Sequence, residues 1–215
     1  MFSVIFDMDG TLTDTQSVCI HAWDYAGELQ GFKNAGESIQ HVCGMNKEGW
    51  EAYLAEHYEG IDLLAFDKAM REYIINSGAP ELKKGAVELL EFLKQNGIKM
   101  AVASGSAKYE IDWKLGETGI IGYFDAFAGG DEIEHCKPAP DVFLLAAERL
   151  GVNPKDCFVF EDASLGIKAG CAAGMKCFGI ADVVPFTEEV KALMFKELGS
   201  LDEAIPILKE YLKGE

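Results

Sequence analysis

Four short apolar runs, each ending abruptly in polar residues, constrain the fold of this chain more than any other feature. Each run has the length and composition of a buried strand. Helical patterns with one apolar face separate the runs, and this alternation predicts an α/β fold in which helices cover both faces of a parallel sheet. The runs are Ser3–Phe6, Ile98–Ala103, Cys157–Phe160 and Met175–Ile180, and the clearest helical patterns are Ala86–Gln95 and Asp141–Leu150.

Residues 15–79 interrupt this alternation. They contain helical patterns at Val18–Leu29, Lys47–His57 and Leu63–Ile75 and no convincing strand. The sequence therefore predicts two domains, and their bounds are 1–14 with 80–215 for a core and 15–79 for a small all-helical cap. An insert after the first strand would overhang the strand ends and act as a lid. The alternative is that these helices merely enlarge the core.

Charge and composition exclude several classes of protein. The net charge of -17 argues against nucleic acid as a partner, because phosphate backbones are bound mainly through an excess of Lys and Arg. No apolar run reaches the roughly 20 residues needed to span a bilayer, and the first apolar stretch lacks the basic flank of a signal peptide. Six cysteines form no CxxC pair, which favours reduced thiols. We expect a cytoplasmic monomer without a membrane partner.

The polar residues after the predicted strands include two pairs of acids. Asp7 and Asp9 follow the first strand, and Glu161 and Asp162 follow another. In a parallel sheet, ligands bind beyond the carboxyl ends of the strands. Together the four acids form an oxygen-rich site suited to Mg2+. Such a cluster repels itself, so it predicts either a metal ion or a protonated carboxyl group that serves as an acid.

Two further segments supply groups that bind phosphate. Lys137 lies in His135–Asp141, where two prolines restrict the backbone and can aim the lysine inward, although a lysine before proline is usually a surface residue. Ser104–Ser106 offer hydroxyl and N–H groups at the start of the next predicted helix, a favourable place for phosphate oxygens. Together with a divalent cation, these groups would let a strongly acidic protein hold a phosphorylated substrate.

These motifs resemble, in order and spacing, the four motifs of the haloacid dehalogenase superfamily, and the resemblance spans essentially the whole chain. It implies a Rossmann-like sheet core. The segments Phe160–Ser164 and Gly166–Gly174 resemble the subgroup of β-phosphoglucomutase and sugar-phosphate phosphatases, whose cap is a helical insert after the first motif. Glycines in the second segment would let a helix pack close to the sheet. The motif residues are Asp7-Met8-Asp9-Gly10-Thr11, Ser104, Lys137-Pro138 and Glu161-Asp162.

The resemblance implies a role for each of four catalytic residues. Asp7 would be the nucleophile that forms an aspartyl-phosphate. Asp9 would protonate the leaving oxygen and later activate water. Ser104 would hold the transferring phosphoryl group, and Lys137 would neutralise charge on Asp7 and on the phosphoryl oxygens.

The resemblance also implies a Mg2+ site and substrate contacts. Mg2+ would be held by Asp7, by the backbone carbonyl of Asp9 and by Asp162, with Glu161 in or next to the coordination shell. The expected substrate is a small phosphorylated metabolite, for which a sugar or polyol phosphate fits the subgroup. The residues expected to bind it are Gly10, Gly105 and Lys47.

Within the subgroup we expect a phosphatase, with a β-phosphoglucomutase-type mutase as the alternative. The mutases carry a histidine that aligns with Cys19 and a cap-loop arginine that aligns with Lys47. His21 is a poor replacement, because a shift of two residues along a helix points it to another face. Lys47 either contacts a second anionic group of the substrate or is an exposed lysine at a helix start.

Three other activities fit the residues less well. A phosphonate hydrolase would need a cap lysine that forms a Schiff base, and Lys47 lacks the flanking pattern expected for one. A dehalogenase would need neither the paired Asp9 nor the metal. A binding protein without turnover is disfavoured because the predicted nucleophile, Asp7, is present.

Overall fold

The computed structural model describes residues 2–42, 45 and 47–213 and contains a six-stranded parallel sheet. The strand order is β3-β2-β1-β4-β5-β6, so β1 lies near the middle of the sheet with β2 and β4 on either side. This confirms the predicted α/β, Rossmann-like architecture. The strands are β1 (Ser3–Phe6), β2 (Met100–Ala103), β3 (Ala126–Ala128), β4 (Cys157–Glu161), β5 (Lys176–Gly179) and β6 (Lys196–Glu197).

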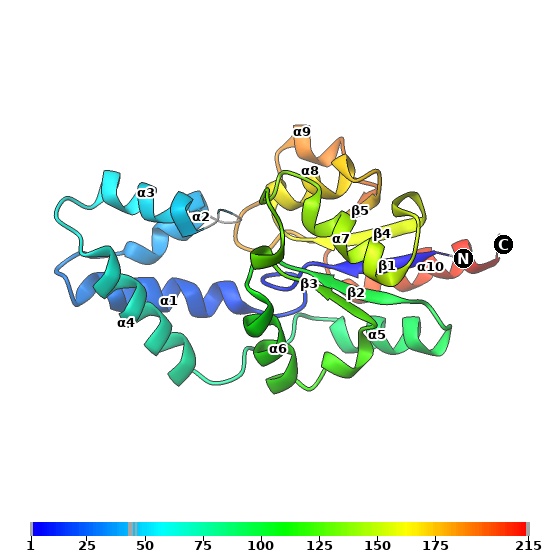
Figure 1. Cartoon of the computed structure of the whole chain (residues 1–215), viewed down its shortest axis with the longest axis horizontal. Helices are drawn as coiled ribbons and strands as arrows, with labels where there is room; N and C mark the ends of the chain where they lie inside the picture. The colour runs from blue at the N-terminus through cyan, green and yellow to red at the C-terminus, as the bar shows by residue number, and fades with distance from the viewer. Residues whose placement is uncertain (1, 43–44, 46, 214–215) are drawn as a thin grey trace.

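Helices cover both faces of the sheet (Figure 1). Alternate residues of β1 point to opposite faces, so Val4 and Phe6 join one apolar cluster and Ile5 joins the other. The first cluster includes residues of α5 (Ala86–Gln95), α6 (Lys108–Glu117) and α10 (Ala204–Lys213). The second includes residues of α7 (Asp141–Leu150), α8 (Ser164–Ala172) and α9 (Glu188–Lys191).

A row of phenylalanine rings crosses the central strands on the first face. Phe6 lies opposite Phe160, which lies opposite Phe178. Their rings are stacked, with centroids 5.0 Å apart for Phe6–Phe160 and 4.8 Å apart for Phe160–Phe178. Because aromatic pairs on neighbouring strands favour a single register, this row helps fix how the strands align. The same register sets the positions of the acids that follow β1 and β4.

Residues 15–79, which we call the insert, are helical and extend to one side of the sheet (Figure 1). The insert has a hydrophobic cluster of its own, in which the ring of Trp23 packs edge-on against Phe66. Asp62 caps α4 by accepting hydrogen bonds from the backbone N–H groups of Leu64 and Ala65. The insert contains α1 (Thr15–Glu28), η1 (Ala35–Ser38), α2 (Ile39–Val42), α3 (Lys47–His57) and α4 (Leu63–Asn76).

The two chain segments that connect the insert to the sheet are paired with each other. Thr13 and Leu82 form an antiparallel bridge. The backbone N–H of Asp14 donates to the carbonyl of Glu81 (2.8 Å), and the N–H of Lys83 donates to the carbonyl of Leu12 (2.9 Å). The chain therefore leaves and re-enters the core through one narrow, hydrogen-bonded neck.

Some elements differ from the sequence-based expectation. The edge strands β3 and β6 were not predicted, and α6 was expected only as a helix after Ser104–Ser106, without bounds. Gly166 and Gly170 lie in α8 against the sheet, as expected, but Gly174 follows the helix in a left-handed turn with φ of 80° and forms no close packing contact there. In the part of the chain that the structure describes, no helix has the length and apolar character required to cross a membrane.

Candidate active site

Three buried carboxylates meet at the carboxyl ends of β1 and β4. Asp7 follows the last residue of β1, Glu161 ends β4, and Asp162 comes next. The pairing of β1 with β4 brings them together, and the backbone N–H of Asp7 donates to the carbonyl of Phe160 (2.9 Å). One oxygen from each carboxylate lies within 4.8 Å of the others. This spacing suits a single metal ion with oxygen ligands.

Lys137 places its ammonium between two of these acids. Its Nζ donates to Asp7 Oδ1 (2.5 Å) and to Glu161 Oε2 (2.7 Å). The lysine side chain is only 8% exposed, and Nζ lies 5.0 Å from the centre of the Phe143 ring. Although burial lowers its pKa, Asp7 and Glu161 raise the pKa well above the usual lysine value, so the ammonium stays charged.

The carboxylates are more numerous than one ammonium can neutralise. Burial and the charge of Glu161 raise the pKa of Asp7 to about 8, despite the opposing effect of Lys137. Burial, Glu161 and Asp7 also raise the pKa of Asp162 well above its usual value. A divalent cation would offset both effects, because a nearby positive charge favours the ionised form of a carboxyl group.

Asp162 is fixed by two side chains and by a glycine. Thr11 donates to Oδ1 (3.1 Å), and the amide of Gln16 donates to Oδ2 (2.5 Å). Gly10 has a φ of 89°, and a Cβ there would lie 2.3 Å from Asp162 Oδ2. Only a glycine therefore allows the loop after β1 to pass so close to the carboxylate. Gln16 belongs to the first turn of α1, so the insert contributes directly to this site.

The carboxylate of Asp9 turns away from the three-acid cluster. Its Oδ2 accepts a hydrogen bond from the hydroxyl of Ser106 (2.7 Å), and its Oδ1 pairs with Lys114 Nζ at 2.6 Å. Burial raises the pKa of Asp9, but Lys114 and Ser106 outweigh it and hold the pKa below its usual value. The expected cluster of four carboxylates is therefore a cluster of three, with Asp9 separated by its own cation.

Ser104 lies at the end of β2 and is buried. Its Oγ accepts a hydrogen bond from the backbone N–H of Ser106 (3.0 Å), and its own N–H donates to the carbonyl of Ala128 (3.0 Å). The first of these bonds uses an oxygen lone pair and leaves the hydroxyl proton for another acceptor. Gly105 and Gly130 are in close contact, because a Cβ at Gly130 would lie 2.1 Å from the carbonyl oxygen of Gly105.

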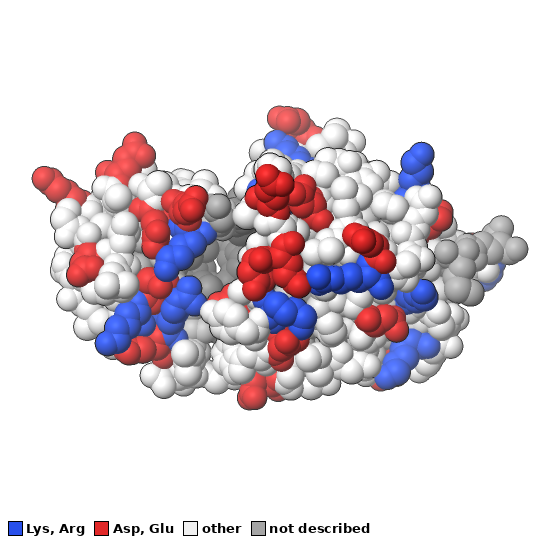
Figure 2. All heavy atoms as spheres, viewed as in Figure 1, with Lys and Arg blue, Asp and Glu red and all other residues white. Residues whose placement is uncertain are grey.

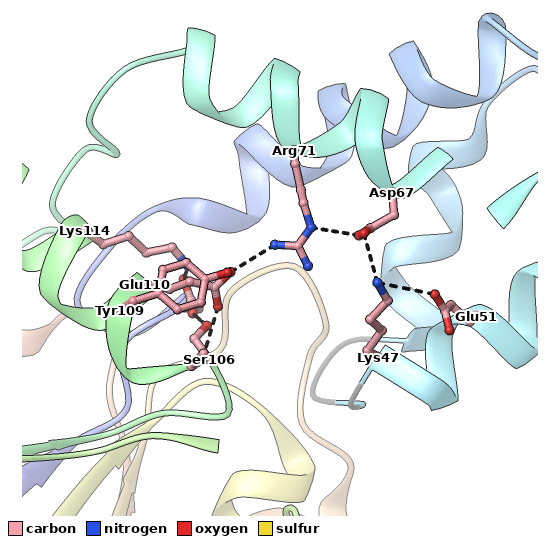
Figure 3. Close-up of polar contacts among 10 residues, drawn as sticks. Lys47, Glu51, Asp67, Arg71, Ser106, Tyr109, Glu110 and Lys114 are labelled. Atoms are coloured by element: carbon pink, nitrogen blue, oxygen red, sulfur yellow. Dashed lines mark hydrogen bonds and ion pairs between the residues drawn. The ribbon is translucent and has the colours of Figure 1, made fainter. Parts of the chain in front are cut away.

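Lys47 lies on the insert and not in the acidic cluster. Its Nζ pairs with Asp67 (2.9 Å) and with Glu51 (3.6 Å). Asp67 also pairs with Arg71 Nε (3.0 Å), and Arg71 reaches across to Glu110 of α6 (3.3 Å), as Figure 3 shows. The space-filling view shows a hollow between the insert and the sheet, with basic side chains on the insert side (Figure 2).

Cys19 lies in α1 close to the charges of Asp9 and Lys114. Burial and the negative charge of Asp9 raise the pKa of its thiol to about 11, with Lys114 opposing the rise. At neutral pH the side chain is therefore a neutral thiol, which is a weak hydrogen-bonding group.

Two cations near the site were missed by sequence reasoning. Lys114 belongs to α6, a helix whose sequence has only two buried apolar residues, Ile111 and Leu115. The helix expected in this segment had no predicted bounds or apolar face, so the sequence pattern did not assign Lys114 to a side of it. The spacing of Glu110 and Lys114 by four residues was the available signal. Arg71 lies within a predicted helix, but its contact with Glu110 could not be predicted because the two residues are distant in sequence.

A buried lysine among three carboxylates at the carboxyl edge of a parallel sheet defines the chain as an α/β enzyme with an acidic site. The sequence profile of haloacid dehalogenase-like hydrolases matches residues 3–174. The chain therefore belongs to the haloacid dehalogenase-like hydrolase family.

Individual relatives are similar along most of their length. A phosphorylated carbohydrates phosphatase of Thermotoga maritima is 33% identical over 99% of this chain and 100% of the relative. A fructose-1-phosphate phosphatase of Escherichia coli is 37% identical over 80% of this chain and 92% of the relative. The crystal structure of a putative β-phosphoglucomutase from Thermotoga maritima has a TM-score of 0.80 and 29% identity, covering 98% of this chain and 99% of that one. Together with the family match, these relatives identify a phosphoric monoester hydrolase.

Proposed function

We propose that this enzyme is a Mg2+-dependent phosphatase for a small phosphorylated sugar or polyol, and that it acts through an aspartyl-phosphate on Asp7. The observation that carries the proposal is the contact of Lys137 with both Asp7 and Glu161 in a buried site. A phosphoryl group that entered this site would meet the carboxylate of Asp7 and the ammonium of Lys137 side by side. Such preorganised charge is usually the largest contribution to catalysis.

The acidic cluster fits a divalent cation. Three carboxylates face one ammonium, which leaves two negative charges uncompensated in a buried site. Asp7, Asp162 and the backbone carbonyl of Asp9 would hold Mg2+, with Glu161 in or next to its shell. When bound, the ion supplies positive charge to the phosphoryl oxygens and keeps Asp7 ionised.

Each of the four candidate catalytic residues has a separate task. Asp7, as a carboxylate, attacks the phosphorus atom, and the bond to the leaving oxygen breaks. Asp9 gives that oxygen a proton and later takes one from the attacking water. The free hydroxyl proton of Ser104 binds a phosphoryl oxygen, and Lys137 stabilises the charge that builds up there.

The insert supplies the substrate-facing side of the site. We propose that residues 15–79 form a cap domain over a core of residues 1–14 and 80–215, and that the cap closes as a lid. Lys47 would meet a second polar or anionic group of the substrate, and Gly10 and Gly105 would let backbone groups approach the phosphate. The names of the two phosphatase relatives support a phosphorylated carbohydrate as the substrate class.

Replacing the nucleophile tests the proposal. Asp7→Asn is nearly isosteric, so the fold should remain, while Mg2+-dependent phosphate release from 4-nitrophenyl phosphate should fall more than about a hundredfold. EDTA should abolish the activity of the unaltered enzyme. Turnover above about a hundredth of the wild-type rate in Asp7→Asn would show that another group attacks the phosphorus. Full activity in EDTA would exclude the metal.

A further inference from the structure

Both carboxylate oxygens of Asp9 have a partner from the sheet domain. Lys114 Nζ lies 2.6 Å from Oδ1, and the hydroxyl of Ser106 donates to Oδ2 at 2.7 Å. The Lys114 side chain is 14% exposed and the Asp9 side chain 29%, so this ion pair is partly shielded from solvent. Two fixed contacts on one carboxylate leave it little freedom to rotate.

Lys114 and Ser106 belong to one continuous piece of structure. Ser106 lies in the loop after β2, and α6 begins two residues later. Glu110 fastens the start of α6 by accepting a hydrogen bond from the backbone N–H of Ala107 (3.1 Å). Lys114 follows Glu110 by one helical turn on the same side of α6, as Figure 3 shows. The orientation of Asp9 is therefore set by the same loop and helix that carry Ser104.

This arrangement matters for hydrolysis of the aspartyl-phosphate, the step in which the insert must let water enter. Water must reach the aspartyl-phosphate, and a lid admits water when it opens. The contacts from Lys114 and Ser106 come from the sheet domain, so neither of them is made by a residue of the insert. Both contacts are to the carboxylate oxygens of Asp9, which are the atoms that would take a proton from the water.

We propose that Lys114 is a positioning residue for the second half-reaction, and that it holds the Asp9 carboxylate in place to take a proton from the attacking water. The water oxygen bonds to phosphorus, the bond between phosphorus and Asp7 breaks, and its electron pair returns to the Asp7 carboxylate. The proton taken by Asp9 protonates the leaving oxygen in the next turnover. This inference rests on the proposed function, because it assumes an aspartyl-phosphate on Asp7.

The test is the variant Lys114→Met, measured with 4-nitrophenyl phosphate and Mg2+. Slow hydrolysis of the phosphoenzyme lowers kcat and KM by the same factor and leaves kcat/KM unchanged, because kcat/KM reports only the steps up to phosphoenzyme formation. We expect kcat and KM to fall about 10- to 100-fold, less than the loss of a whole general base. A rapid burst of 4-nitrophenolate, approaching one per chain, should precede the slow steady rate.

Two variants control for structural damage. Lys108→Met removes another lysine of the same helix, one that pairs with Asp112, and it should leave kcat, KM and the burst unchanged. Lys114→Arg keeps a positive charge and should recover part of the lost kcat. If Lys114→Met fails to fold, Lys114→Gln removes the charge with a smaller change in polarity, and the same measurements on it decide the question.

The outcomes separate this inference from the proposed function. If Asp7→Asn is inactive but Lys114→Met shows no fall in kcat, Lys114 has no positioning role and the inference alone is wrong. It is also wrong if kcat/KM falls while KM stays constant and no burst appears, since Lys114 would then act before the phosphoenzyme forms. If Asp7→Asn retains turnover, the proposed function and this inference are both wrong.

Discussion

At the scale of residues, the site is governed by an imbalance of charge. Burial and the charge of Glu161 raise the pKa of Asp7 to about 8, because Lys137 neutralises only part of the buried cluster. In the proposed mechanism Asp7 must be ionised to attack, so a bound cation would prepare the site for chemistry.

This imbalance predicts that stabilisation by Mg2+ grows with pH. The folded-state pKa of Asp7 lies above its unfolded value of 3.8, so the stability it gives the metal-free protein is lost as pH rises towards about 8. Mg2+ competes with that proton, and its binding should strengthen over the same range. We expect about 5–10 °C of thermal stabilisation at a roughly hundredfold excess over Kd at about pH 9, and clearly less at about pH 6.

Differential scanning calorimetry with and without Mg2+ measures this difference. The matched control is Asp7→Asn, in which one titrating carboxyl group is absent and the pH dependence should be weaker. Equal stabilisation at both pH values in the unaltered protein would contradict the charge argument.

Sequence alone could place most of these residues but not their orientation. Asp7, Glu161 and Asp162 were predictable because each follows an apolar strand, and parallel strands end at the same edge of a sheet. The inward direction of Lys137 was inferred from its two prolines and from family resemblance. The separation of Asp9 from the other acids was not predictable, because it depends on Lys114, and the sequence pattern does not show which side of α6 faces the site.

At the scale of elements, the close packing of α8 on β4 fixes one side of the site. A Cβ at Gly166 would lie 2.0 Å from the Glu161 side chain, which in turn accepts a hydrogen bond from Lys137. The glycine therefore lets the helix approach the strand closely enough for Glu161 to stay beside Lys137.

We predict that alanine substitutions at two helical glycines change the free energy of unfolding in opposite directions. Gly166→Ala should lower the free energy of unfolding by about 1–3 kcal/mol and reduce activity, because it forces Glu161 away from Lys137. Gly116→Ala, in α6, meets nothing within 4 Å and should raise the free energy of unfolding by about 0.5–1 kcal/mol. Urea denaturation of both variants measures the change. If Gly166→Ala leaves the free energy of unfolding unchanged, Glu161 can move aside without loss of stability.

The predictability of elements followed their length and periodicity. α5 and α7 were predicted with the bounds the structure gives, because each has a clear apolar face and a glycine just beyond its end. The edge strands β3 and β6 have three and two residues, too few for an alternating pattern to emerge.

At the scale of the whole molecule, the insert contacts the sheet domain at two places beside the site. Arg71 of the insert contacts Glu110 of α6, and Gln16 of the insert contacts Asp162. The insert thus touches both the helix that carries Lys114 and the acidic cluster. Cys19, where the mutases carry a histidine, offers only a weak hydrogen-bonding group for a sugar hydroxyl.

We therefore predict hydrolysis and not transfer within one sugar. β-Glucose 1-phosphate, even with a bisphosphate activator, should yield free phosphate or no reaction, and a coupled glucose-6-phosphate dehydrogenase assay should show no steady production of NADPH. NADPH formation at a rate comparable to phosphate release from the best substrate would make the enzyme a mutase. The companion variant, Cys19→His with Lys47→Arg, restores the mutase-like residues. If it gains no transfer activity, the acceptor preference has another origin in the insert.

The paired neck between Thr13 and Leu82 has a consequence for the modularity of the chain. The two residues form an antiparallel bridge, so their Cα atoms are only about 5 Å apart, a gap that a two-residue hairpin turn closes. The 68 residues between them could be excised and replaced by such a turn without re-routing any strand of the sheet. A hydrolase built this way can exchange its insert as a cassette without changing the connectivity of its sheet.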